Sequence, residues 1–389
     1  MIVKIRNNRA VCNRRLPYFL FLSIFVCIKD YDMDELYYNA VDLLKALISV
    51  PSISRVEDKA ADIDAGFLEN NGCEVRRSGN NVWTVAAGYS SEKPTLLLNS
   101  HIDTVRPVAG WEHDPFTAVE DEDGRIYGLG SNDAGASLVS LAAAYLWLSS
   151  KRQPYNLVFL ASCEEEVSGK GGIESVLTLL PPVDFAVVGE PTGMRPAVAE
   201  KGLIVLDGRI AGVSGHAARN DGVNAIYKAI GVVGALRDLR FPLESEYLGP
   251  VRISVTQMEA GTQHNVVPDL CKIVVDVRTT DAYTNEQTLE LIRGAVPDCV
   301  LEPRSLRLRP SSVPVGPPVV QRLVFAGKEP FGSPALSDQA LMPFPSVKVG
   351  PGDSARSHTA DEFIYADEIR EAIQMYVTVL DGFLDVYFL

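Results

Sequence analysis

The chain has 389 residues, of which 47% are hydrophobic and 8% aromatic, a composition that supports a buried core and excludes a wholly disordered protein. It carries 36 Lys and Arg against 50 Asp and Glu, a formal charge of −14, which argues against a nucleic-acid partner because phosphate binding needs a basic face. Its six cysteines form no Cys-x-x-Cys pair, so we expect reduced thiols in a cytoplasmic enzyme.

The first 32 residues differ from the rest of the chain. Basic residues dominate them, and an apolar stretch at 16–28 follows, as in the n- and h-regions of a signal peptide. At 13 residues the stretch is too short for an ordinary membrane-spanning helix, and no clear cleavage site follows it. Three interpretations stay open: translation that starts at Met33, an export or anchor segment, and a disordered tail. We expect a cytoplasmic protein without stable membrane association, with export still open.

The remainder of the chain alternates between helix and strand patterns. Apolar residues over 43–48 have helical spacing, and 136–148 predicts another helix. Short apolar runs at 95–100, 156–162 and 184–189 predict buried strands of an α/β sheet. A histidine or a glutamate comes soon after each run, and open α/β sheets place their sites at this end of the strands.

The middle of the chain predicts a second, smaller unit. Its elements have the β-α-β-β-α-β order of a ferredoxin-like fold, with strands at 203–211, 251–258, 270–279 and 300–308 and helices at 223–239 and 285–296. A Pro-rich stretch at 310–318 then leads back to a strand near 347–350 and a C-terminal helix over 367–384. We predict a catalytic α/β domain over 33–201 and 311–389, with a central mixed sheet flanked by helices, and an inserted α+β domain over 202–310.

Two histidines and several carboxylates follow the predicted strands. In chain order they are His101 with Asp103, Asp133, the triplet Glu164-Glu165-Glu166, Glu190 and His358. Two imidazoles with several carboxylates suit a pair of borderline divalent ions such as zinc, because each ion can take a nitrogen, carboxylate oxygens and a water. Taken singly, these residues have plainer explanations, such as a helix cap or a solvated turn. If the set converges in space, the protein is a two-metal hydrolase.

Two of these residues suit roles beside the metals. Three adjacent glutamates repel one another, and a cation would balance them; one could then bind a metal while its neighbour accepts a proton from the attacking water. Asp103 alternates with His101 at a strand end, so its carboxylate could orient the second ring nitrogen of that histidine.

Together these motifs resemble the M20 family of metallopeptidases and deacylases, which includes acetylornithine deacetylase, succinyl-diaminopimelate desuccinylase and the glutamate carboxypeptidases. The resemblance covers essentially 33–389 and implies a zinc-exopeptidase-like catalytic domain with an inserted lid domain. It implies that Glu165 is the general base and that Asp103 is the partner of His101. The family usually begins the triplet with Asp, where this chain has Glu164. The implied metal ligands are His101 and Glu190 for one ion, Glu166 and His358 for the other, and Asp133 as the bridge.

The resemblance also implies that the inserted domain carries a homodimer interface. Its Val213-Ser-Gly-His216 segment resembles a lid motif whose histidine reaches an active site, often that of the partner subunit, and stabilises the oxyanion. Asn265 and Arg278 are expected to contact the carboxylate of the substrate, and Gly352 is expected to lie in the substrate site. His113 is expected in an entrance loop.

The implied reaction is hydrolysis of the amide that links a small acyl group to an amino acid, with zinc or cobalt as cofactor. The motifs are most similar to those of acetylornithine deacetylases, which implies N-acetylornithine as substrate and a place in arginine biosynthesis. Succinyl-diaminopimelate, succinylornithine and succinylcitrulline are rivals, because Arg106, Arg219 or Arg356 could receive a second carboxylate. A dipeptidase or aminoacylase stays open. A non-catalytic binding module would have lost a ligand or the base, and none is missing.

Overall fold

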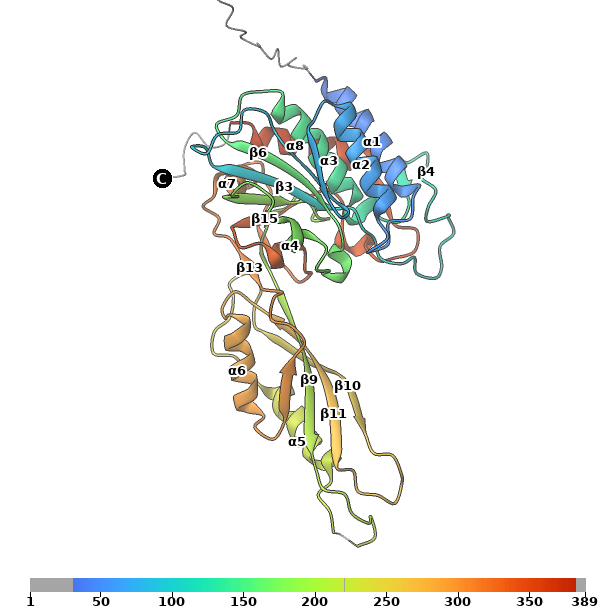
Figure 1. Ribbon diagram of the computed structural model, residues 1–389, viewed down its shortest axis with the longest axis vertical. Coiled ribbons are helices and arrows are strands. Elements are labelled where there is room, and N and C mark those ends of the chain that lie inside the picture. Colours follow the sequence, from blue (N-terminus) through green and yellow to red (C-terminus); the bar gives the residue numbers. More distant parts are fainter. Residues whose placement is uncertain (1–30, 220, 383–389) are drawn as a thin grey trace, which may run out of the picture.

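The computed structural model describes residues 31–219 and 221–382, arranged as two lobes (Figure 1). Most of the predicted N-terminal extension lies outside the described residues. Its last two positions are described, and Asp32 is the N-cap of the first helix, with its side chain accepting a hydrogen bond from the backbone N–H of Asp34 at 2.9 Å. No helix in the described ranges has the length and apolar character needed to cross a membrane.

The first lobe is built on a nine-stranded mixed sheet with the order β1-β2-β6-β3-β7-β15-β8-β13, in which β14 pairs with β8. Strands β6, β3, β7 and β15 run parallel, and β1, β2, β8 and β13 join by antiparallel pairing. The predicted fold class is confirmed. The strands are β1 (Val75–Ser78), β2 (Asn81–Val85), β3 (Thr95–His101), β6 (Asn156–Ser162), β7 (Phe185–Val188), β8 (Ala197–Glu200), β13 (Ser311–Ser312), β14 (Phe331–Ser333) and β15 (Ser346–Lys348).

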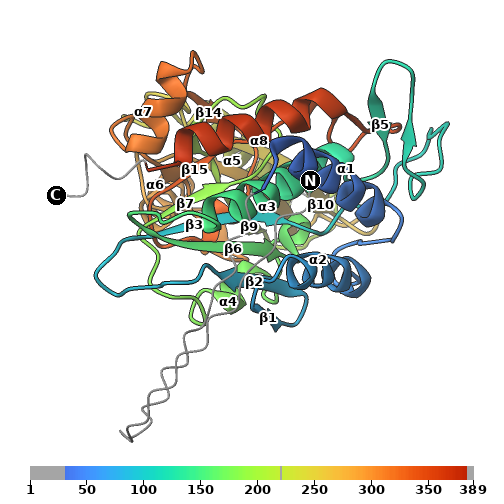
Figure 2. The ribbon, with the colours of Figure 1, turned by 90° about the horizontal axis from the view of Figure 1, so that it is seen from above.

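Helices cover both faces of this sheet. Successive residues of a strand point to opposite faces, so the residues of β3 contribute alternately to two different hydrophobic cores. Leu96 and Leu98 join the larger core, and Leu97 lies in the smaller one with Ile173 and Val176 of α4. Figure 2 shows α1, α3 and α8 side by side over the larger core. The helices are α1 (Met33–Ile48), α2 (Asp58–Asn70), α3 (Ala136–Ser149), α4 (Ile173–Val176), α7 (Pro318–Phe325) and α8 (Ala366–Leu380).

The C-terminal helix is shorter than predicted. It ends at Leu380, because Asp381 leaves the helical conformation with ψ of 120°. A small sheet at the side of the lobe contains β4 (Val119–Glu120), β5 (Arg125–Tyr127) and β16 (Phe363–Tyr365) in the order β16-β5-β4. The pairing of β16 with β5 in this small sheet holds the segment that follows His358 in place.

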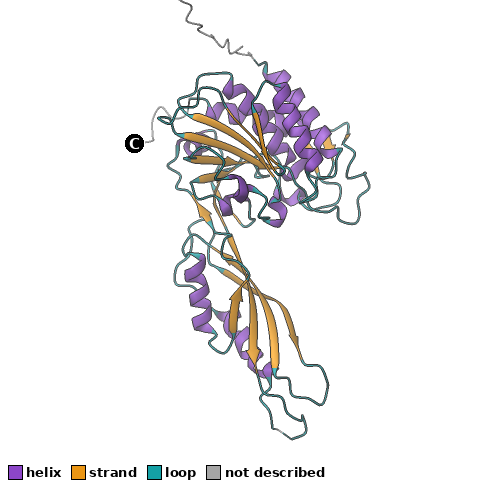
Figure 3. Ribbon diagram, viewed as in Figure 1, coloured by secondary structure: helices purple, strands orange, loops and turns teal. Residues whose placement is uncertain are grey.

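The second lobe is a four-stranded antiparallel sheet in the order β10-β11-β9-β12, with both helices on one of its faces (Figure 3). The predicted β-α-β-β-α-β order is confirmed. The last strand ends at Pro303 instead of 308, since beyond it only isolated bonds, such as Leu203 N–H to the Leu308 carbonyl, keep the chain beside β9. The elements are β9 (Gly202–Ala211), α5 (Ala225–Asp238), β10 (Arg252–Ala260), β11 (Leu270–Thr279), α6 (Asn285–Ala295) and β12 (Val300–Pro303).

This lobe has a hydrophobic core of its own, with Ile204, Leu206 and Val275 from the sheet and Ala229 and Ile292 from the helices. The chain enters the lobe at Gly202 and leaves it after Pro303. The exact domain boundaries, between residues 201 and 202 and between residues 310 and 311, stay a prediction.

Candidate metal centre

The candidate ligands meet at one edge of the large sheet. His101 is the last residue of β3, the glutamate triplet follows β6, and Glu190 follows β7. These strands are parallel neighbours, with His101 opposite Ser162 and Asn99 opposite Val188. Carboxyl ends of adjacent parallel strands lie at the same edge, which brings residues far apart in sequence into one group.

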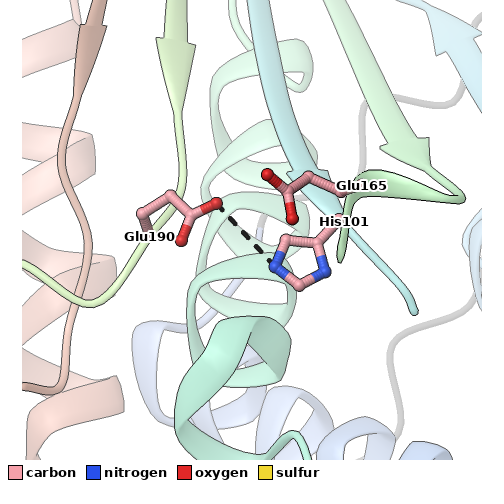
Figure 4. Close-up of side chains that lie close together, drawn as sticks. All are labelled: His101, Glu165 and Glu190. Carbon is pink, nitrogen blue, oxygen red and sulfur yellow. Dashed lines mark ion pairs between the residues drawn. The ribbon is translucent and has the colours of Figure 1, made fainter. Parts of the chain in front are cut away.

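His101 is the most deeply buried member of this group and is 2% exposed. Its Nε2 is 3.4 Å from Oδ1 of Asp133 and 3.8 Å from Oε1 of Glu190. Figure 4 shows the carboxylates of Glu165 and Glu190 turned toward the imidazole from two sides. One nitrogen and several carboxylate oxygens therefore face a common space.

A second imidazole lies on the other side of Asp133. Nε2 of His358 is 3.1 Å from the carboxylate of Glu166 and 3.5 Å from Oδ2 of Asp133. The two oxygens of Asp133 thus face two different histidines, His101 through Oδ1 and His358 through Oδ2. This is the arrangement that a carboxylate bridging two metal ions requires.

The chemistry of the donor set fits a pair of divalent ions. Four carboxylates, those of Asp133, Glu165, Glu166 and Glu190, gather around two imidazoles, and the donor atoms of His101 with Glu165 and Glu190, or with Asp133 and Glu166, lie within 4.8 Å of one another. Burial raises the pKa of Glu165, and it raises that of Glu190 to about 8. Cations at this position would relieve the excess of negative charge.

The turn that carries Asp133 is held by Glu362. The Glu362 carboxylate is 2% exposed and accepts the backbone N–H groups of Gly130, Asn132 and Asp133 at 3.0, 2.9 and 2.9 Å. The Asp133–Ala134 peptide bond is cis. Sequence reasoning assigned no role to Glu362, although the Asp-Glu pair that follows His358 was the available signal.

Two further buried carboxylates hold the triplet. Asp103 accepts the backbone N–H groups of Glu165 and Glu166 at 2.9 and 3.1 Å, and Glu57 accepts that of Glu164 at 3.1 Å. The three successive N–H groups are therefore bonded to carboxylates. Sequence reasoning missed Glu57, because a glutamate just before a helix is ordinarily a surface residue; it is the N-cap residue of α2, and its side chain makes no capping bond.

Asp103 lies beside His101 with both its backbone and its carboxylate, and its expected pairing with the imidazole stays a prediction. Nδ1 of His101 lies 2.9 Å from the backbone carbonyl oxygen of Asp103 and 3.6 Å from its nearer carboxylate oxygen. The carboxylate is instead occupied by Ser54 and by the N–H groups of Glu165 and Glu166. Asp103 thus orients the imidazole through its main chain and the triplet through its side chain.

Glu164 folds away from the metal group. Its backbone is left-handed, with φ of 55°, and its carboxylate accepts the N–H of Gly171 at 3.3 Å. A Cβ atom at Gly169 or Gly171 would overlap that carboxylate. This explains the glycines after the triplet and leaves Glu165 and Glu166 as the two members that face the metal group.

A cavity of about 260 Å³ adjoins the metal group and is where a substrate would fit. Its far wall is largely apolar, with Pro191, Phe331, Pro334 and Leu336, and Lys348 is its one basic residue apart from His358. A larger cavity of 670 Å³ lies at the opposite edge of the sheet, beside Gln153, and contains none of the candidate ligands.

The predicted lid residues lie away from this cavity. His216 and Asn265 are exposed in the loops that follow β9 and β10, at the end of the second lobe that is distant from the first (Figure 1). The two loops contact each other, since the N–H of Ala217 donates to the Asn265 carbonyl at 3.1 Å. Within one chain the structure therefore does not bring His216 to the metal group.

Three other predicted residues have different surroundings. Arg278, near the end of β11, forms an ion pair with Asp276, and the ring Nδ1–H of His113 donates a hydrogen bond to the Asp361 carboxylate at 3.1 Å. Gly352 is buried with φ of 86°, and a Cβ there would overlap the Asn132 side chain. Gly352 thus packs against the residue that precedes Asp133 and is not among the residues that line the cavity, so its place in the substrate site stays a prediction.

The comparison with protein families decides the family of this chain. The profile of peptidase family M20/M25/M40 matches residues 97–382, which is more than half of the chain. The chain belongs to this family. It is therefore an M20 metallohydrolase that cleaves amides, and the metal group described above lies within the matched residues.

Curated relatives of this M20 protein have modest sequence identity over most of their length. It is 29% identical over 361 residues to an acetylornithine deacetylase of Edwardsiella ictaluri, covering 85% of this chain and 94% of the relative. It is 27% identical to an acetylornithine deacetylase of Proteus mirabilis, covering 88% and 96%.

Solved structures share its fold. Aminopeptidase PepT of Bacillus cereus has a TM-score of 0.71 at 19% identity, covering 88% of this chain and 98% of the other. The YXEP protein of Bacillus subtilis, described as a dinuclear metal binding peptidase from the M20 family, has a TM-score of 0.68 at 17% identity, covering 89% and 98%. Both lobes of this M20 protein thus have counterparts in known folds.

Proposed function

We propose that this protein is a dinuclear-metal N-acyl amino acid deacylase that removes the acetyl group of N-acetylornithine, a cytoplasmic step of arginine biosynthesis. The observation that carries the reaction type is the Asp133 carboxylate, whose two oxygens face His101 and His358. The names of the curated relatives support the substrate.

The proposed ligands are His101 and Glu190 for one ion and Glu166 and His358 for the other, with Asp133 shared between them. Zinc is the proposed metal and cobalt a substitute, because nitrogen and carboxylate donors suit both. When two such ions are bound, they acidify water and polarise the carbonyl of the scissile amide.

Glu165 is the proposed general base. It lies in the group with His101 and Glu190, and its carboxylate makes no hydrogen bond within the described residues. It is therefore free to take a proton from the attacking water and return it to the departing amine. Asp103 fixes the Glu165 backbone, which keeps the carboxylate directed toward the cavity.

The second lobe is proposed to act as a lid and to form a homodimer. His216 lies too far along that lobe to serve its own chain's metal group, so the proposed oxyanion contact comes from a partner subunit. Tyr227 and Ile230 of α5 are 74% and 63% exposed, an apolar pair of the kind that a subunit interface covers.

A desuccinylase is the second candidate, and it would need a cation near the cavity that can receive a second carboxylate. Arg356 is not available, because its guanidinium donates to Glu368 at 2.6 Å. Lys348 lines the cavity but is bound to Glu200 at 2.8 Å. The cavity wall itself thus favours a short, uncharged acyl group.

Initial rates on acetylornithine, acetylcitrulline, succinylornithine, succinylcitrulline and succinyl-diaminopimelate, measured with zinc and with cobalt, test the proposal. Acetylornithine should give the highest kcat/KM. The Glu165→Gln variant should bind metal as the wild type does and lose about 10²–10⁴-fold in kcat. An active Glu165→Gln enzyme, or a wild-type protein inert on all five substrates, would contradict the proposal.

A further inference from the structure

Arg307 connects the second lobe to the turn that carries the glutamate triplet. It lies in the segment 304–310, which leads from β12 back to β13 of the large sheet. Its guanidinium donates through Nη2 to the backbone carbonyl of Ser168 and through Nη1 to the Glu174 carboxylate at 3.1 Å. Ser168 directly follows the 3₁₀ turn Glu165–Val167, so the returning segment is bonded to the end of that turn.

The backbone on both sides of Arg307 is held by the second lobe. The side-chain amide of Asn285, the first residue of α6, donates to the carbonyls of Leu306 and Leu308 at 3.1 and 2.9 Å. Asn285 is fully buried, and its own amide oxygen accepts the hydroxyl of Thr279 at 2.8 Å. The backbone of Arg307 therefore belongs mechanically to the second lobe, although its side chain bonds the first.

The triplet turn is held at its two ends by different lobes. At its start, Asp103 of the first lobe accepts the N–H groups of Glu165 and Glu166. At its end, Ser168 has a left-handed backbone with φ of 43°, a conformation that a residue other than glycine keeps only when its surroundings impose it. The bond from Arg307 to the Ser168 carbonyl is one such restraint, and it comes from the returning segment of the second lobe.

The bond to the carbonyl is the more important of the two contacts of Arg307. The ion pair with Glu174 is partly exposed, with 26% of the arginine and 44% of the glutamate side chain accessible, and such pairs contribute little. A charged donor on a carbonyl in a partly buried turn is a stronger interaction. Glu174 lies on α4, at the side of the first lobe that faces the second (Figure 1), and is placed to orient the guanidinium.

We propose that Arg307 is a positioning residue for the reaction, which holds Glu165 and Glu166 in place through the carbonyl of Ser168. This role rests on the proposed function, in which Glu165 is the base and Glu166 a metal ligand. Without the bond, the end of the turn is free to shift, and a misplacement of about 1 Å can cost roughly a hundredfold in rate. A displacement of the second lobe would strain the same bond, so the position of the base depends on that lobe.

Kinetics of three variants with N-acetylornithine test the role. Arg307→Met removes the donors and should lower kcat by roughly tenfold to a hundredfold, while KM changes little because Arg307 does not line the substrate cavity. Arg307→Lys keeps a charged donor and should recover part of this loss. Arg309→Met is the matched control, because Arg309 lies in the same segment and bonds Glu286 of its own lobe at 2.8 Å. Equal kcat values for wild type and Arg307→Met would overturn the proposal.

Hydrogen exchange of the metal-free proteins separates this role from the function itself, because it needs no turnover. The amides of Glu165, Glu166 and Ser168 should exchange roughly tenfold faster in Arg307→Met than in wild type or Arg309→Met, even if the protein were to hydrolyse none of the five amides. The amides of β3 should exchange at the wild-type rate.

Equal exchange at the turn in all three proteins would overturn the positioning role and leave the deacylase proposal intact. Faster exchange in β3 as well would also overturn it, because Arg307 would then stabilise the whole lobe instead of the turn.

Discussion

The carboxylate of Glu57 accepts the backbone N–H of Glu164 at 3.1 Å, although the two residues are 107 positions apart in the chain. Glu57 is fully buried and also accepts the N–H of Arg55 at 2.6 Å and the side-chain amide of Asn80 at 3.1 Å. It thus ties the loop before α2 to the turn that presents Glu165 and Glu166.

Removing this acceptor should loosen the turn. We expect Glu57→Ala to lower kcat by roughly tenfold or more with little change in KM, because a buried N–H left without a partner costs about 1–3 kcal/mol. Glu57→Gln keeps an acceptor oxygen and should restore most of the activity. Zinc affinity of the metal-free variants, measured by competition with a chelator, should follow the same order. Wild-type kinetics and zinc affinity for Glu57→Ala would contradict this role.

Glu362 should matter for metal binding although its carboxylate is bonded only to backbone N–H groups. In Glu362→Gln an amide NH₂ would face one of those donors, and we expect zinc affinity to fall by about 10–100-fold. The neighbouring Asp361 is the control, since its carboxylate bonds the backbone of Glu112 and His113 instead. Asp361→Asn should keep wild-type affinity in the same titration, and equal affinities for all three proteins would count against the role of Glu362.

Asp64 predicts a pH-dependent stability. It is 1% exposed, its Oδ2 has no hydrogen-bond partner, and burial raises its pKa to about 8. Between pH 4 and pH 8 the unfolded chain loses the proton of this group while the folded protein keeps it, so the free energy of unfolding falls as pH rises. Above about pH 8 the folded carboxyl also ionises and the penalty stays constant.

Asp64→Asn should therefore stabilise the protein by on the order of 3 kcal/mol near pH 8.5 and by much less near pH 4.5. Urea unfolding at the two pH values measures the difference. Asp42→Asn, at an exposed position of α1, should have no such effect. A gain for Asp64→Asn that is equal at both pH values would be inconsistent with a buried, protonated carboxyl.

The proposed homodimer can be tested through α5. Ile230→Glu should place a charge in the interface and convert the protein to monomers in sedimentation velocity, with a loss of kcat if His216 acts across subunits. Phe325→Glu is the matched control, because Phe325 is the more exposed of the two at 87% but lies on α7 of the first lobe. A wild-type protein that sediments as a fully active monomer would rule out the contribution of a partner subunit.

Helices and strands could be predicted well from the sequence where their apolar residues recur with a regular spacing. Leu96, Leu97 and Leu98 mark a strand covered on both faces, and His101 at its end could be recognised as a candidate ligand without a structure. The positions of Asp133 and His358 relative to each other could be expected only from the family resemblance, since no local pattern joins residues so distant in the chain.

The carboxylates that bond backbone N–H groups could not be predicted. Glutamates such as Glu57 and Glu362 usually lie on the surface. Their burial depends on backbone N–H donors in loops that are far away in the sequence. Glu164 was an obvious member of an acidic triplet, yet its left-handed backbone turns it into the glycine loop. Local sequence indicates which residue types are present and cannot indicate which donors will reach them.

The position of β15 bears on how the protein is made. This strand lies between β7 and β8 in the interior of the large sheet, although β7 and β8 are close in sequence and the whole second lobe is synthesised before β15. Until β15 has been synthesised the sheet lacks the strand that joins β7 to β8, so we expect the first lobe to complete its fold only when nearly the full chain is available. Since His358 follows β15, metal loading would come after synthesis, once this strand has paired.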